Sequence, residues 1–137
     1  MPANASIYIP HENIRLGSVF DDDRSSGSPG VVDLSIAGQL VRFNLMSKND
    51  VQEHVNKFIN YIQSLDMESD RMEDAITAIR QTKSVIGLET VLEFKECPEI
   101  WENLFKIAKH FDGYVFSYES LMLPNGGVIF GPLLNES

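Results

Sequence analysis

The sequence is short of cysteine, of positive charge and of long apolar runs. Cys97 is the only cysteine among 137 residues, so no internal disulfide can form, which favours a reducing compartment. No apolar run approaches the roughly 20 residues that a membrane-spanning helix needs. The N-terminal segment MPANASIYIPHENIR lacks both the basic and the apolar region of a signal peptide. These absences predict a cytoplasmic protein without a membrane role.

Acidic residues outnumber basic residues by 20 to 11, which gives a net charge of -9. A chain of this charge repels phosphate groups, and this disfavours direct binding to nucleic acids or to anionic membranes. Two interpretations remain. The charge maintains solubility, as in many cytoplasmic proteins, or it attracts a partner protein with a basic surface.

The residue types that bind metals and cofactors are scattered along the chain. His11, His54 and His110 form no H-x-x-x-H pair and have no neighbouring cysteine to share a zinc ion. Asp21–Asp23 supply oxygen atoms, but the twelfth position of an EF-hand loop needs a glutamate, and Val32 stands there. Glycine-rich phosphate loops are missing too. The sequence therefore predicts neither a metal site nor a cofactor.

Cys97 is the one candidate nucleophile with a physical argument behind it. It precedes Pro98, the expected first residue of a helix, and a helix N-terminus stabilises a thiolate. Covalent catalysis also needs a positioned base, and no histidine lies near Cys97 in the sequence. Glu96 and Glu99 oppose a thiolate. The favoured interpretation is a structural cysteine in a chain that leans towards a non-catalytic role.

Alternating apolar residues predict several strands. The clearest pattern is a hairpin whose turn lies at residues 37–39. Its apolar positions are Val32, Leu34, Ile36, Val41, Phe43 and Leu45. Further strands are expected at 6–9, 14–20, 83–94, 114–118 and 128–130. The first two are expected at a sheet edge, because Pro10 fits an edge better than a sheet centre.

Apolar residues spaced by three and four predict three helices. Asp50 with Glu53 is expected to cap the first helix, and Gly113 to end the third in the left-handed conformation. The predicted helices span 51–65, 69–79 and 98–111. On the third helix the aromatic residues expected in the core are Trp101, Phe105 and Phe111.

This order of elements predicts an α+β fold, with a mostly antiparallel or mixed sheet and about three helices packed on one face. A doubly wound parallel fold would need a regular alternation of strands and helices, which is absent. Residues 1–137 are expected to form one domain. Within this domain, residues 21–30 are expected to form a flexible polar loop and residues 132–137 a polar tail.

The last third of the chain contains a helix, an Asp112-Gly113 break, a strand and a turn at 124–127. From Trp101 to Ile129 it resembles the closing unit of small, uncharacterised bacterial α+β proteins, some of which serve as immunity proteins in toxin systems. The resemblance rests on core and turn residues. It implies a fold, and it carries over no functional residue.

Two acidic clusters are the candidate binding residues for a basic partner surface, which they would attract mainly by speeding association. They are Asp21, Asp22 and Asp23 in the loop, and Glu89, Glu93 and Glu96 along and after the long strand. The leading hypothesis is a non-catalytic, acidic protein-binding or regulatory domain. Its sharpest version is an immunity-type inhibitor of a partner protein.

Two alternatives stay open. The first is a small-molecule-binding domain or weak enzyme, with a pocket between sheet and helices around Tyr114, Tyr118 or Glu119. The second is a homodimer formed through an open sheet edge.

Overall fold

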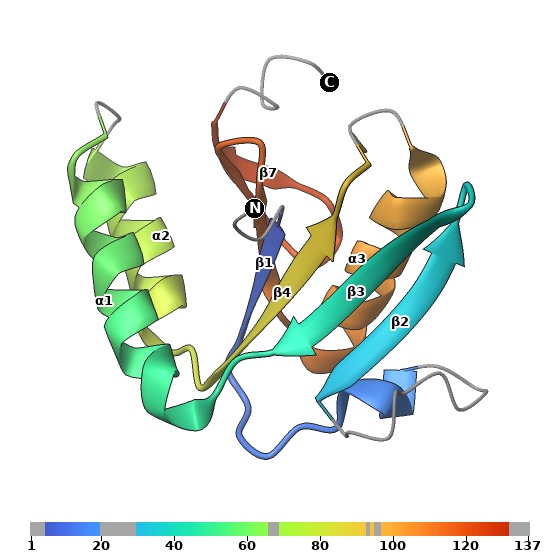
Figure 1. Ribbon diagram of the computed structural model, residues 1–137. Coiled ribbons are helices and arrows are strands. Elements are labelled where there is room, and N and C mark those ends of the chain that lie inside the picture. The colour runs from blue at the N-terminus through green and yellow to red at the C-terminus, as the bar shows by residue number, and fades with distance from the viewer. Residues whose placement is uncertain (1–4, 20–29, 66–68, 93, 95–96, 132–137) are drawn as a thin grey trace.

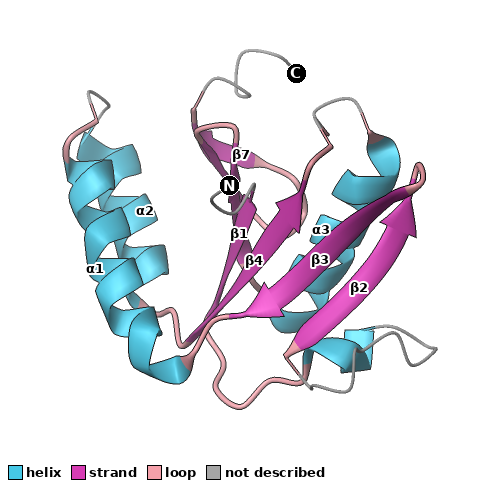
Figure 2. Cartoon of the chain, in the orientation of Figure 1, coloured by secondary structure: helices cyan, strands magenta, loops and turns pink. Residues whose placement is uncertain are grey.

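The computed structural model describes residues 5–19, 30–65, 69–92, 94 and 97–131. Within these residues the chain forms helices and strands, which Figure 2 distinguishes by colour. The helices are η1 (Leu16–Val19, a 3₁₀ helix), α1 (Lys48–Gln63), α2 (Ser69–Arg80) and α3 (Pro98–Phe111). The strands are β1 (Ala5–Ile9), β2 (Val31–Ile36), β3 (Gln39–Leu45), β4 (Ser84–Thr90), β5 (Tyr114–Ser117), β6 (Ser120–Met122) and β7 (Val128–Phe130). The predicted α+β class is confirmed.

The described strands form one seven-stranded antiparallel sheet in the order β2-β3-β4-β1-β5-β6-β7 (Figure 1). β1 lies at its centre, between β4 and β5, so the predicted edge position of residues 6–9 is wrong. Pro10 follows the last paired residue, Ile9, and therefore removes no hydrogen bond from the ladder. Ile7 and Tyr8 are both buried, as a strand covered on both faces requires.

The strand predicted at 14–20 is wrong for its described residues, 14–19. The structure has η1 at Leu16–Val19 instead. Leu16 and Val19 are three residues apart and both buried, so a single helical turn points both side chains into the core.

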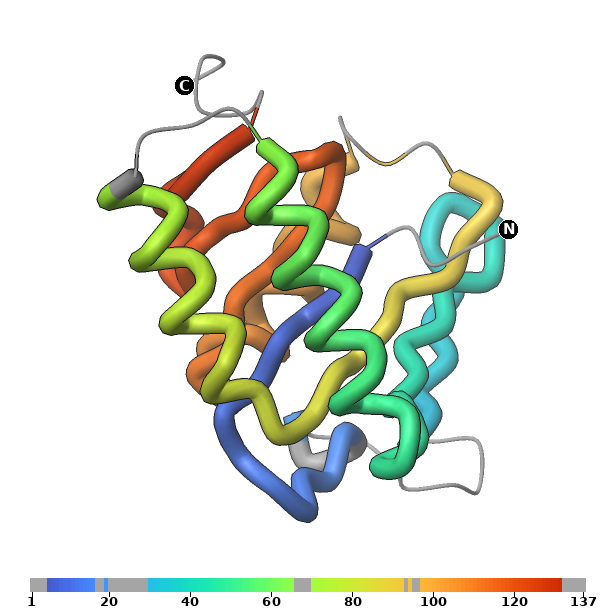
Figure 3. The backbone as a smooth tube through the Cα atoms, turned by 90° about the vertical axis from the view of Figure 1, so that its left-hand side faces the viewer, coloured from blue at the N-terminus to red at the C-terminus, as the bar shows by residue number. Residues whose placement is uncertain are grey.

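The helices lie on opposite faces of the sheet, so the predicted packing on one face is wrong. Ile7 belongs to the apolar cluster that contains α3 and η1, whereas its neighbour Tyr8 belongs to the cluster that contains α1 and α2. Consecutive residues of a strand point to opposite faces. Figure 3 shows α1 and α2 side by side in front of the sheet. An apolar stripe on a helix does not specify which face of a sheet it covers.

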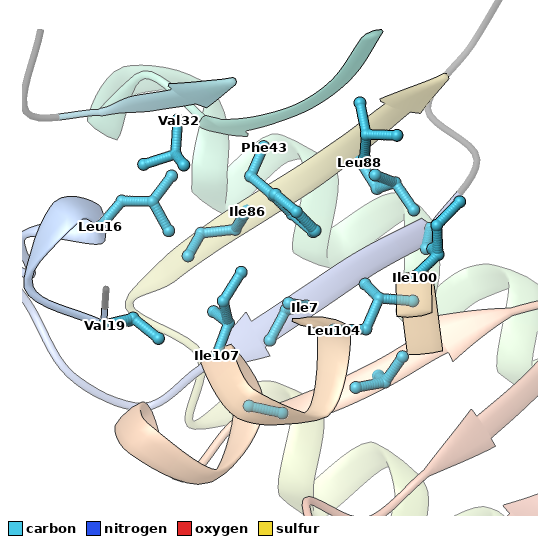
Figure 4. Packing of buried hydrophobic residues seen from close by; sticks show 14 of the residues in the cluster. Ile7, Leu16, Val19, Val32, Phe43, Ile86, Leu88, Ile100, Leu104 and Ile107 are labelled. Atoms are coloured by element: carbon cyan, nitrogen blue, oxygen red, sulfur yellow. The ribbon is translucent and has the colours of Figure 1, made fainter. Parts of the chain in front are cut away.

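The core on the α3 face consists mostly of aliphatic side chains. Figure 4 shows side chains from the sheet, η1 and α3 meeting in it. Full burial of one such side chain stabilises the fold by about 1.5–3 kcal/mol. The largest members that are fully buried include Ile7, Leu16, Phe43, Ile86, Leu88, Ile100, Leu104 and Ile107.

The core on the α1/α2 face contains a stack of aromatic rings. Tyr8 stacks on Phe58 of α1, with ring centroids 4.7 Å apart and planes inclined by 4°. Phe116 of β5 meets Phe58 edge-on, also at 4.7 Å. Such pairs add about 0.5–1.5 kcal/mol beyond the area that they bury. The predicted apolar stripe of α1 is confirmed, since Val51, Val55, Phe58, Ile59 and Ile62 are buried.

Two tight hairpins organise the sheet. The predicted hairpin of β2 and β3 is confirmed, and its turn residues Ala37 and Gly38 have φ of 54° and 76°. Tyr118 and Glu119, with φ of 51° and 61°, form a second turn of this kind between β5 and β6. The sequence did not predict this second turn, because neither residue is the glycine, asparagine or aspartate that favours positive φ.

Helix α1 begins earlier than predicted. Ser47 occupies its N-cap position, without a side-chain hydrogen bond to the first turn. The predicted cap formed by Asp50 and Glu53 is therefore wrong. Asp50 lies in the first turn, where its charge still favours the positive end of the helix dipole.

Helix α3 ends at Phe111, and its C-cap residue Asp112 has φ of 58°. The left-handed residue is therefore Asp112, and its predicted position at Gly113 is wrong. Gly113 serves a different purpose. A Cβ atom at this position would lie 2.7 Å from Ile7 Cγ2 and 2.9 Å from Ile9 Cγ1. The glycine therefore permits the close approach of β5 to the central strand.

Candidate functional site

On the face that α1 and α2 occupy, the described helices and loops leave one half of the sheet uncovered. Figure 1 shows α1 and α2 to one side, with β2 and β3 running clear of them. The side chains of β2, β3 and β4 that point towards this uncovered side are mostly exposed or half-buried. We call this surface the open sheet face and define it by Asp33, Ser35, Leu40, Arg42, Asn44, Glu89 and Val91.

An ion pair across two strands lies at the centre of the open sheet face. Asp33 of β2, Arg42 of β3 and Glu89 of β4 are cross-strand neighbours. Arg42 Nε donates to Asp33 Oδ1 at 2.7 Å, and its Nη2 donates to Oδ2 at 3.1 Å. The hydrogen bonds with Asp33 and the charge of that carboxylate raise the pKa of Arg42, and the charge of Glu89 raises it further. Arg42 is thus held by Asp33, while Glu89 remains exposed.

Two exposed apolar side chains extend the open sheet face at one end. Leu40 is 54% exposed and Val91 is 80% exposed. The register of β3 and β4 pairs Arg42 with Glu89 and ends with Val41 and Thr90. Leu40 precedes Val41 in β3, and Val91 directly follows the last residue of β4. In the described part of the chain, the one other exposed large apolar residue is Tyr61 of α1. The open sheet face therefore combines an apolar end with a charged centre.

A hydrogen-bonded pair lies under α1, where that helix meets the central strand. The Tyr8 hydroxyl lies 2.9 Å from His54 Nε2. Burial lowers the pKa of His54, and the positive charge of Lys57 lowers it further. Burial raises the pKa of Tyr8. At neutral pH both groups are therefore uncharged, and a His54 ring protonated at Nδ1 accepts the hydroxyl hydrogen of Tyr8.

The predicted acidic residues fall into two groups. Glu89 is exposed on the open sheet face. Asp21–Asp23, Glu93 and Glu96 lie outside the described residues, as do the loop at 21–29 and the tail at 132–137. Gly30, the last residue of the predicted loop, accepts a hydrogen bond from the Leu45 amide at 2.6 Å.

The residues predicted to surround a pocket do not form one cluster. Tyr114 packs in the core of the α1/α2 face, whereas Tyr118 packs in the core of the α3 face. Glu119 is exposed in the β5–β6 turn. These three residues therefore do not line a common polar cavity.

Cys97 and the histidines are separate from one another. Cys97 occupies the N-cap position of α3 and is half-buried beside the α3-face core. His11 lies 3.4 Å from Asp112, and the ring of His110 meets Phe111. Within the described residues, no three His, Cys, Asp or Glu side chains gather to hold a metal ion. The helices that the structure describes include none long and apolar enough to cross a membrane.

Comparison of the chain with protein-family models, with curated proteins and with solved structures gives no match. The site must therefore be interpreted from its own chemistry. Sequence reasoning selected Glu89 but missed Asp33, Arg42, Leu40 and Val91. The alternation of Asp33 and Arg42 with apolar neighbours did predict a polar strand face, but the exposure of Leu40 and Val91 depends on how far α1 extends over the sheet.

Proposed function

We propose that this chain is a non-catalytic protein-binding domain, and that the open sheet face receives a partner with a basic surface. The observation that carries the proposal is the exposure of Leu40 and Val91 beside an exposed Glu89 on a surface built mostly from strands. Protein interfaces commonly join an apolar contact area to a charged rim. A strand-built surface also holds its side chains rigidly, which limits the entropy lost on binding.

Charge complementarity supports a basic partner. The chain has a net charge of -9, so its field attracts a cationic surface and repels an anionic one. On the open sheet face, Arg42 is already hydrogen-bonded to Asp33, and Glu89 adds an exposed carboxylate. A partner that presents lysine or arginine next to an apolar residue matches both parts of this surface. An immunity-type inhibitor of a basic toxin is the sharpest form of the proposal.

Affinity capture and a salt titration test this function. The tagged chain is incubated with source lysate at low ionic strength, and proteins retained in stoichiometric amount are identified by mass spectrometry. The purified partner is then titrated at 50 and 500 mM salt. We expect an association that weakens about tenfold or more over this range, because screening acts on exposed charges. A complex of unchanged affinity would contradict a partner chosen by charge.

A further inference from the structure

A hollow of about 540 Å³ lies on the other side of the molecule, between the outer flank of α3 and the turn that joins β6 to β7. It is separate from the open sheet face, because α3 covers the opposite face of the sheet. Helix α3 supplies two aromatic rings, two lysines and one glutamate to its wall, and the turn supplies Asn125 and Gly126. This combination of rings and cations in an acidic chain indicates a specific class of ligand.

The two rings form a fixed wall. Ile100, Leu104 and Ile107 point into the core, as Figure 4 shows, so Trp101 and Phe105 lie on the flank of α3. Their centroids are 6.1 Å apart and their planes are inclined by 20°. Both are half-buried, so part of each ring reaches solvent, in contrast to the full core position that their spacing predicted.

Two further aromatic rings contact Trp101. Phe94 meets Trp101 edge-on at 5.3 Å, and Tyr118 lies 6.1 Å from it. An aromatic side chain fixed in this way loses little entropy when a ligand stacks on it. Trp101 is therefore a prepared surface for a planar ring.

The lining of this hollow carries two ammonium groups beside the two rings. Lys106 and Lys109 are exposed, and with Glu102 they give the lining a charge of +1, against -9 for the whole chain. Asn125 Oδ1 accepts a hydrogen bond from the Gly127 amide at 2.9 Å, which fixes the side chain of Asn125 at the rim. The two lysines thus favour an anionic group here, against the negative net charge of the whole chain.

We propose that this hollow binds a small ligand that joins a planar ring to a phosphate or carboxylate group. The ring lies against Trp101 and Phe105, and the anionic group meets the ammonium groups of Lys106 and Lys109. Stacking on an aromatic face tolerates many ring systems, so the lysines supply the selection for charge. This inference does not depend on the protein-binding role of the open sheet face.

Trp101 is the only tryptophan of the chain, so its fluorescence reports directly on the hollow. The probes are adenosine monophosphate, which carries a phosphate, benzoate, which carries a carboxylate, and adenosine, which is the uncharged comparison. We expect saturable quenching by at least one of the two anions and weaker binding of adenosine. The anion that binds more tightly identifies the preferred acidic group.

Charge variants locate the binding. The double variant Lys106→Gln/Lys109→Gln should weaken binding about tenfold, since it removes two charge-assisted contacts. Lys48→Gln/Lys83→Gln removes the same charge at exposed positions elsewhere and should change the dissociation constant by less than about twofold. The proposal is overturned if neither anion gives saturable quenching up to about 10 mM, if adenosine binds as tightly as its monophosphate, or if both double variants have the same effect.

Discussion

The Tyr8 hydroxyl lies 2.9 Å from His54 Nε2, and this contact joins the central strand of the sheet to helix α1. It lies beside the stacked rings of Tyr8 and Phe58, so the same tyrosine contributes both a polar and an apolar contact. The position of α1 decides how much of the sheet stays uncovered. The contact between Tyr8 and His54 therefore helps to define the open sheet face.

The lowered pKa of His54 predicts that the fold loses stability in mild acid. His54 has a lower pKa in the folded chain than in the unfolded chain, so at pH values between the two the unfolded chain binds more protons at this position. The free energy of unfolding therefore falls as the pH drops below about 6.5. Urea unfolding of the wild type at pH 7.5 and 5.5 measures this fall. His54→Gln should reduce it. An identical pH dependence in the wild type and this variant would contradict the prediction.

Tyr8→Phe separates the hydrogen bond from the ring stack. The variant keeps the ring that stacks on Phe58 and should lower the free energy of unfolding by about 1 kcal/mol, the usual net value of one hydrogen bond. Tyr8→Ala also removes the ring and should cost about 3–5 kcal/mol. Both values come from urea denaturation at pH 7.5. Equal losses in the two variants would show that the ring stack contributes nothing.

Gly113→Ala tests the close approach of β5 to β1. The new Cβ would meet Ile7, Ile9 and the Tyr8 carbonyl, at 2.7, 2.9 and 3.2 Å, and should destabilise the fold by about 1–3 kcal/mol. Asp112→Gly is the matched variant, because residue 112 has φ of 58° and glycine adopts this conformation without strain. We expect Asp112→Gly to preserve or raise the melting temperature. If Gly113→Ala leaves the stability of the fold unchanged, β5 can shift away from the sheet centre.

Local patterns predicted much of the fold. The hairpin of β2 and β3, the apolar stripe of α1 and the extent of α3 follow from periodicity, because each depends on residues close in sequence. The central position of β1 was missed, although Ile7 and Tyr8 are both apolar, since Pro10 indicated an edge. The distribution of helices over two faces depends on long-range packing, which periodicity does not encode.

The candidate site was predicted only in part. Glu89 was selected for its charge, and it does lie exposed on the open sheet face. In the alternating pattern Leu40 falls on the face of Arg42, and Val91 falls on the face of Glu89, opposite the predicted core. The pattern does not show whether another element covers that face. The exposure of Leu40 and Val91 arises because α1 and α2 lie over β1 and the C-terminal strands rather than over β2 and β3. No single stretch of sequence contains that information.

Charge reversal at Glu89 tests the central claim most directly. The affinity of the captured partner is measured for the wild type, for Glu89→Lys and for Glu73→Lys, which makes the same charge change at an exposed position on α2. Circular dichroism establishes that each variant is folded, and Leu40→Ser serves as a second variant of the open sheet face. We expect Glu89→Lys and Leu40→Ser to weaken binding about tenfold or more, and Glu73→Lys by less than about threefold. Equal effects of Glu89→Lys and Glu73→Lys, with no effect of Leu40→Ser, would show that the partner binds elsewhere.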